Sequence, residues 1–169
     1  MRTKQDGAQG ERVAQALLSG AGFSAFTFST SFSLRFSRDR PGSLLGYPLP
    51  AEVELDLDAR WWLDDEQEWK AKVARLAPEG AVEPEEPVQA YELAALRWTE
   101  GTTVVSVVVS AGMISVRFGN GRLLTATGNA EDDGRAWTLS ETGVAEKSAR
   151  WSVCSEGGVI FVRAPCLSE

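Results

Sequence analysis

Apolar and polar side chains alternate through much of the first third of the chain. In residues 23–36 apolar side chains recur at every second position apart from Thr30, namely at Phe26, Phe28, Phe32, Leu34 and Phe36. Residues 51–62 repeat this alternation with smaller apolar side chains. A period of two is typical of β-strands that bury one face. We therefore predict N-terminal strands within residues 23–62, interrupted by a proline- and glycine-rich loop.

Three other segments carry apolar positions at helical spacing. We predict helices at residues 8–20, 64–77 and 87–98, with an acidic, proline-rich connector at residues 78–86 between the last two. Either of the two aspartates that open the second helix can cap it, and the proline directly after it ends it. The proline that opens the third helix suits a first turn, where no helical hydrogen bond is lost.

The C-terminal half is dominated by β-branched and aromatic residues. Five apolar segments follow one another within residues 102–164, joined by short turns, of which Asn120-Gly121 is the strongest hairpin signal. Consecutive strands with short connections favour an antiparallel meander over βαβ units. The predicted fold is α+β, a single domain over residues 1–169 in which two or three helices pack on a curved antiparallel sheet of seven or eight strands.

The same half resembles a known family. The stretches TVVSVVVSAGMISVRFGNGRLLTATGNAEDDGRAWTLSE and WSVCSEGGVIFVRAP, within residues 102–165, are similar to a family of small bacterial proteins catalogued as a domain of unknown function. The shared pattern is an apolar strand, a Phe-Gly-Asn-Gly hairpin, a tryptophan strand after an acidic loop, and a last hairpin with paired glycines. The resemblance implies the fold and a non-catalytic role, because members look like immunity proteins encoded beside secreted toxins. It supplies no catalytic residues.

Composition excludes several kinds of chemistry. The 169 residues contain no histidine, which excludes Ser-His-Asp and Cys-His catalysis and nearly all zinc and iron sites. The two cysteines, Cys154 and Cys166, are expected to be free thiols. The N-terminus has no apolar stretch of the secretory type, and the longest apolar run is too short to span a bilayer. We expect a cytoplasmic protein with no membrane partner.

Negative charge is concentrated in one segment. The net charge is −7, and residues 52–86 alone carry twelve acidic and four basic side chains, a balance of −8. Nucleic acids are poor partners for such a surface, because phosphate binding needs clustered lysine and arginine. An acidic surface instead speeds the encounter with a basic protein.

The acidic side chains follow one face of the strand predicted at residues 51–62. Trp62 shares their alternation register, and more acids follow directly, so the candidate partner-binding set is Glu52, Glu54, Asp56, Asp58, Trp62, Asp64, Asp65, Glu66 and Glu68. An aromatic anchor beside acids is typical of tight protein interfaces. The alternatives are a solvated face, such as an edge strand protected by charge, and a Trp62 that packs with Trp61 against the helix bearing Trp69.

Other functions have weaker support. Carboxylates along a flat strand diverge and do not form a calcium loop, and the Glu131–Gly134 segment is closer to a polar hairpin loop than to a metal site. No pair of acids is singled out for glycoside hydrolysis, and no glycine pair opens a helix as a phosphate loop does. We therefore predict a non-catalytic, immunity-type binding protein for a basic toxin domain, without metal or cofactor. The alternatives are a small-molecule or lipid binder using a Phe-lined sheet face, and a structural domain.

Overall fold

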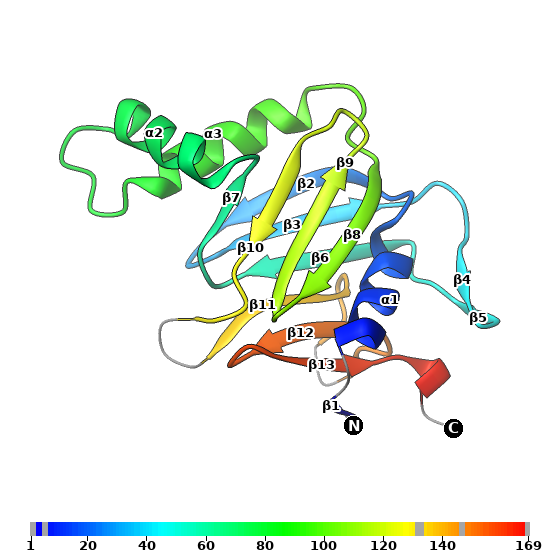
Figure 1. The fold of residues 1–169 in the computed structure, drawn as a ribbon. Helices are drawn as coiled ribbons and strands as arrows, with labels where there is room; N and C mark the ends of the chain where they lie inside the picture. The colour runs from blue at the N-terminus through cyan, green and yellow to red at the C-terminus, as the bar shows by residue number, and fades with distance from the viewer. Residues whose placement is uncertain (1–2, 5–6, 131–133, 146–147, 168–169) are drawn as a thin grey trace.

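Two antiparallel sheets pack against each other in the computed structural model, which describes residues 3–4, 7–130, 134–145 and 148–167 (Figure 1). The larger sheet has the order β1-β13-β12-β11-β6-β3-β2 and the smaller one β7-β10-β9-β8. The strands of the larger sheet are β1 (Thr3–Lys4), β2 (Gly22–Phe28), β3 (Phe32–Ser37), β6 (Glu52–Leu57), β11 (Arg135–Glu141), β12 (Ser152–Glu156) and β13 (Val159–Arg163). Those of the smaller sheet are β7 (Trp61–Leu63), β8 (Val104–Ser110), β9 (Met113–Phe118) and β10 (Leu123–Ala126).

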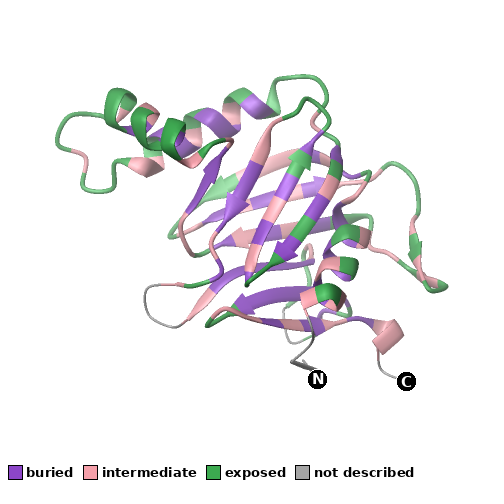
Figure 2. Ribbon diagram, viewed as in Figure 1, coloured by how far each residue is buried: buried purple, intermediate pink, exposed green. Residues whose placement is uncertain are grey.

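Aromatic and branched side chains from both sheets form the core. The ring of Phe36 on β3 stacks on that of Phe118 on β9 with centroids 6.4 Å apart, and Phe23 on β2 lies 6.3 Å from the same ring. All three side chains are at most 2% exposed and belong to the hydrophobic core (Figure 2). Most of the predicted Phe-lined face therefore packs within the protein's own core, while Phe28 at its end is 46% exposed.

The predicted strand over residues 51–62 is two strands in different sheets. β6 ends at Leu57 and β7 begins at Trp61. Between them the amides of Asp58 and Ala59 both donate to the carbonyl oxygen of Ala136, at 3.0 and 2.8 Å, and the chain then crosses to the smaller sheet. β6 is also paired on both sides, by β3 and β11, so the edge-strand interpretation of its charges is wrong.

Three helices complete the fold. α1 (Gly7–Leu18) packs on β8, β12 and β13, while α2 (Glu66–Leu76) and α3 (Glu85–Arg97) form a hairpin beside β7 and β2 (Figure 1). The side chain of Asp65 accepts hydrogen bonds from the amides of the second and third residues of α2, as predicted for its cap. α3 begins two residues earlier than predicted, so Pro87 lies in its first turn.

The α+β prediction is confirmed, but the C-terminal strands do not form one meander. β8, β9 and β10 belong to the smaller sheet, and β11, β12 and β13 to the larger one. The Asn120-Gly121 turn is present, with the Gly121 amide donating to the Phe118 carbonyl at 2.9 Å. A separate short hairpin joins β4 (Ser43–Leu44) to β5 (Tyr47–Pro48), and a 3₁₀ turn spans Pro165–Leu167.

None of the described helices has both the length and the apolar character needed to cross a membrane. Cys154 and Cys166 are not joined in a disulfide, as predicted, and Cys154 is buried.

Candidate functional site

The outer face of β6 carries the predicted row of carboxylates. Val53, Leu55 and Leu57 point into the core and are at most 2% exposed. The alternate positions point outward: Glu52 and Asp58 are exposed, and Glu54 and Asp56 are partly buried. The period-two prediction for this strand is confirmed. It results from the pleat, which sends successive side chains to opposite faces of a sheet.

Neighbouring strands set the electrostatics of this row. Ser33 on β3 lies in register with Asp56, and its hydroxyl donates a short hydrogen bond to the Asp56 carboxylate. Arg35 lies in register with Glu54 and forms an ion pair with it at 3.4 Å. Burial raises the pKa of Asp56 above its ordinary value, and the charges of Glu54 and Asp58 raise it further, while the Ser33 hydrogen bond opposes the shift. The row therefore holds a carboxylate in surroundings that disfavour its charge.

A polar hollow of about 450 Å³ adjoins this row. Its lining residues include Glu54, Asp56 and Asp58, together with residues 143–145. Thr138 and Ser140 also line the hollow; they lie beside Asp56 and Glu54 on β11 and are 4% and 9% exposed. The Thr138 hydroxyl is buried and has no hydrogen-bond partner among the described residues. Arg135 also lines the hollow, and its charge opposes the rise in the pKa of Asp56. Carboxylate and hydroxyl oxygens outnumber this single guanidinium, so the hollow can accept hydrogen bonds from a ligand.

A second hollow of about 310 Å³ continues the first and shares Ser31 and Asp58 with it. Residues 83–86, at the end of the connector and the start of α3, also line it and contribute Glu83, Glu85 and Glu86. Glu85 is paired with Arg60 at 3.3 Å. We call the two adjoining hollows the acidic groove, defined by Glu54, Asp56, Asp58, Glu83 and Glu86.

An exposed aromatic ring borders the acidic groove. Phe28, near the end of β2, lines the second hollow and is 46% exposed. Its ring packs on that of Phe32, with centroids 4.5 Å apart. Because this contact fixes the ring, Phe28 can serve as a rigid apolar anchor for a partner. Our sequence-based prediction assigned this anchor role to Trp62.

Trp62 does not share the outer face with the carboxylates. It lies on β7, opposite Thr125, and is only 7% exposed. The Arg60 guanidinium covers its ring at 5.1 Å from the centroid. The prediction that Trp62 extends the acidic face is wrong, because the chain changes sheets before it. The alternative that both tryptophans are buried fits, with the Trp61 ring 6.4 Å from that of Trp69.

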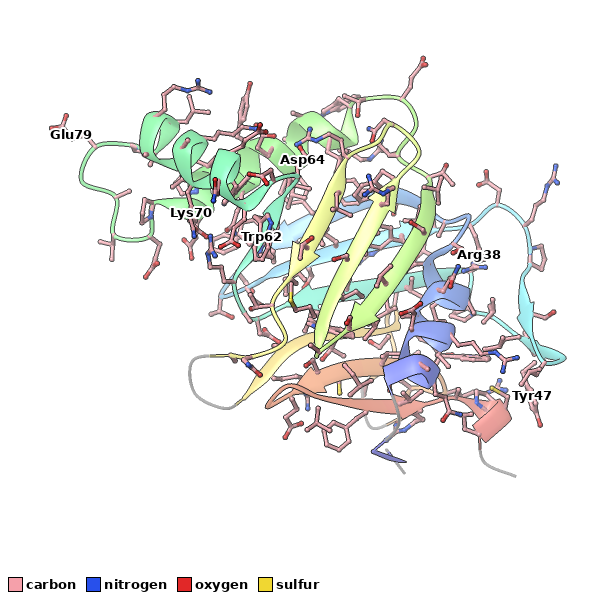
Figure 3. All side chains as sticks on the ribbon, viewed as in Figure 1. Arg38, Tyr47, Trp62, Asp64, Lys70 and Glu79 are labelled. Atoms are coloured by element: carbon pink, nitrogen blue, oxygen red, sulfur yellow. The ribbon has the colours of Figure 1, made fainter. Side chains whose placement is uncertain are left out.

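The acids that follow Trp62 have partners within the chain. Asp64 forms an ion pair with Arg122 at 2.6 Å and accepts a hydrogen bond from the Leu123 amide. Glu66 is paired with Arg60 at 2.7 Å and with Lys70 at 3.0 Å. Asp65 caps α2, and Glu68 is exposed on that helix. Figure 3 shows Trp62, Asp64 and Lys70 in the region where β7 meets α2. The charges of Asp64 and Glu66 are compensated in place, which leaves them less available to a partner.

Sequence reasoning predicted the outward direction of Glu52, Glu54, Asp56 and Asp58 correctly. It noted the connector glutamates as further acids without placing them in the candidate set, and it missed Phe28 and the β11 hydroxyls. The connector was visible as an acidic segment, but no local pattern says that it folds beside β6, some 25 residues away in sequence.

The site offers no metal chemistry within the described part of the chain. No group of three or more histidine, cysteine, aspartate or glutamate side chains there is arranged to hold a metal ion. Three of the four residues in the Glu131–Gly134 loop lie outside the described residues. The acidic groove can accept hydrogen bonds and bind positive charge.

Comparison of the chain with protein-family models, with curated proteins and with solved structures gives no match. The resemblance to the family of small bacterial proteins therefore stays a prediction.

Proposed function

We propose that this chain is a non-catalytic binding protein that docks a cationic protein through the acidic groove. The observation that carries the proposal is the convergence of two segments far apart in sequence. Glu54 and Asp56 from β6, Asp58 directly after it, Glu83 from the connector and Glu86 from the first turn of α3 line two adjoining hollows. Such a surface fits lysine and arginine side chains of a partner, which donate the hydrogen bonds that its oxygens accept.

The electrostatics support a binding role. Burial raises the pKa of Asp56, and the charges of Glu54 and Asp58 raise it further. A positive charge brought next to Asp56 offsets this repulsion. A partner cation is thus stabilised by several carboxylates at once, while the free protein bears their mutual repulsion. Long-range attraction by the net charge of −7 also raises the rate of encounter with a basic protein.

The partner class we propose is a basic toxin domain, in the manner of an immunity protein acting in the cytoplasm. Toxins that act on nucleic acids carry basic grooves, because they must bind phosphates, and an acidic surface complements such a groove. The resemblance in residues 102–165 supports this role, and the absence of histidine from the sequence argues against an enzyme that uses a histidine acid or base.

The test is capture of toxin domains secreted by the source organism, using the full chain as bait. The variant Asp56→Asn/Asp58→Asn/Glu86→Gln removes three charges of the acidic groove and conserves side-chain size. The control Glu68→Gln removes one charge on α2, outside the groove. We expect a cationic toxin domain to bind the native chain and the control, and to bind the groove variant at least tenfold more weakly, since several charged contacts are lost. Equal capture by the groove variant and the native chain would refute the groove as the interface.

A second assay asks whether binding neutralises activity. A captured toxin domain co-expressed with the native chain should permit cell growth, and co-expression with the groove variant should not. Toxicity that persists with the native chain despite tight binding would argue against the immunity role and leave the binding role in place.

A further inference from the structure

An apolar pocket lies between the end of α2 and the start of α3. It has a volume of about 270 Å³ and is lined by Leu76, Pro78, Pro87, Val88 and Tyr91. All five are apolar or aromatic, and Val88 is a buried side chain at 2% exposure. Nothing in the described chain covers Leu76 or Tyr91, which are 47% and 65% exposed. Large apolar side chains gathered in the open mark an interaction surface more often than singly scattered ones do.

The connector adds to the exposed apolar area. Val82 is 91% exposed at the far end of the helical hairpin, the region where Figure 2 shows the connector as almost wholly exposed.

The chain segments that carry the pocket are acidic. Glu79 directly follows Pro78, and Glu86 directly precedes Pro87, so each proline of the pocket has a glutamate neighbour in sequence. Figure 3 shows Glu79 pointing outward from the hairpin. Residues 75–91 contain four glutamates and a single arginine, Arg75. The walls of the pocket are apolar, and we call the two flanking glutamates, Glu79 and Glu86, its acidic rim.

This combination selects among possible occupants. A lipid surface rich in anionic headgroups would be repelled by the glutamates. A second copy of the chain, packed pocket to pocket, would bring two acidic rims together, and like charges across an interface oppose association. A partner segment with one large apolar side chain and flanking lysine or arginine satisfies both the walls and the rim.

We propose that this pocket binds a basic segment of a protein partner, which inserts a leucine-sized or aromatic side chain between α2 and α3. The pocket adjoins the acidic groove through the neighbouring residues Glu86 and Pro87. It extends the proposed docking surface by an apolar anchor, the element that contributes most to affinity at protein interfaces. The proposal goes beyond charge attraction, and it can be tested separately from the acidic groove.

Three labelled model peptides of equal length provide the probes, each used below its own self-association concentration. A Leu/Lys amphipathic peptide has both the charge and the anchor, an Ala/Lys peptide has the charge alone, and a Leu/Glu peptide has the anchor with the opposite charge. Fluorescence anisotropy with the full chain measures each dissociation constant. We expect the Leu/Lys peptide to bind about tenfold more tightly than the Ala/Lys peptide, and the Leu/Glu peptide to bind most weakly.

Variants locate the binding. Tyr91→Ala removes one wall of the pocket, and Leu76→Lys places a cation in it; both positions are exposed, so the fold should tolerate the changes, as a thermal melt would verify. Each should weaken Leu/Lys binding to the level of the Ala/Lys peptide. Trp98→Ala is the matched control, because Trp98 is an aromatic residue adjoining the same helix, 87% exposed and outside the pocket. It should leave binding unchanged.

Three outcomes would overturn the proposal: Leu/Glu binding as tight as Leu/Lys binding, Leu/Lys binding unaffected by Tyr91→Ala and Leu76→Lys, or a dimer in sedimentation that Tyr91→Ala dissociates. A different result would refute the acidic groove as a cation-binding surface. In that case the Asp56→Asn/Asp58→Asn/Glu86→Gln variant would bind the Ala/Lys peptide as tightly as the native chain does.

Discussion

Removing the central charge of the β6 row should stabilise the protein. In Asp56→Asn the amide oxygen can still accept the hydrogen bond from Ser33, but the repulsion from Glu54 and Asp58 disappears. Neighbours on one face of a strand are about 6.7 Å apart, so each like pair costs roughly 0.6 kcal/mol in water. Screening by salt reduces the sum of two pairs to about 0.5 kcal/mol. The variant also no longer buries a charge, which adds to this stabilisation. We therefore expect the free energy of unfolding to rise by roughly 0.5–1 kcal/mol at pH 7.

The pH dependence follows from the direction of the pKa shift. The pKa of Asp56 is raised in the folded state, so the folded chain binds this proton more tightly than the unfolded chain does. The ionised carboxylate therefore destabilises the native chain fully above the folded pKa, and the penalty vanishes below the unfolded value, near pH 4. The advantage of Asp56→Asn should be largest at neutral pH and should shrink as the pH falls through this range.

Urea denaturation at pH 7 and at about pH 3.5, with Glu68→Gln as the control, measures both effects. The free energy of unfolding of Asp56→Asn should exceed that of the native chain at neutral pH, and by less in high salt. A variant that is less stable than the native chain at pH 7, or a gain that does not diminish in acid, would show that the carboxylates do not repel one another as argued.

Three further changes test the packing, each by the midpoint of urea denaturation. Gly128→Ala should cost more than about 2 kcal/mol, because the new methyl carbon would lie 2.4 Å from the backbone of Gly112; no loss would mean that this approach is relaxed in solution. Trp137→Phe removes the 2.7 Å hydrogen bond from the indole to the Gly112 carbonyl and should cost about 1–2 kcal/mol. Arg122→Met removes the 2.9 Å partner of the buried Glu92, which keeps Lys72 at 3.2 Å, and should cost about 1–2 kcal/mol. An unchanged midpoint for Trp137→Phe or for Arg122→Met would contradict the estimate for that variant.

Local sequence patterns predicted correctly those features that depend on one helix, strand or turn alone. The alternation of β6 predicted which of its side chains point into the core, and the aspartate cap and following proline predicted where α2 begins and ends. The Asn120-Gly121 pair predicted its turn. In each case the physical cause lies within a few residues of the effect.

Local sequence patterns did not predict which strands pair with which, because that pairing depends on residues far apart in the chain. Residues 51–62 continue the period-two pattern into Trp61 and Trp62, and only the hydrogen bonds from Asp58 and Ala59 to the distant Ala136 carbonyl show where the chain leaves the larger sheet. The assignment of the C-terminal strands to two sheets likewise depends on partners far along the chain.

Which acids form the acidic groove could likewise not be predicted from local sequence patterns. The charge balance predicted an acidic surface, but its membership depends on tertiary contacts. Arg122 and Arg60 compensate Asp64 and Glu66, whereas Glu83 and Glu86 lie across from Asp58. A count of charges along the chain does not distinguish these two groups, because it contains no information on which arginine lies near which acid.

The central claim, that the acids of β6 and of the connector act as one docking surface for cations, is tested most directly by an NMR titration of the ¹⁵N-labelled chain with the Ala/Lys peptide. The account predicts that amide shifts will concentrate at residues 54–58 and 83–86 and will weaken together as salt is added. Shifts spread evenly over the acidic residues, or centred on residues 64–68, would contradict it.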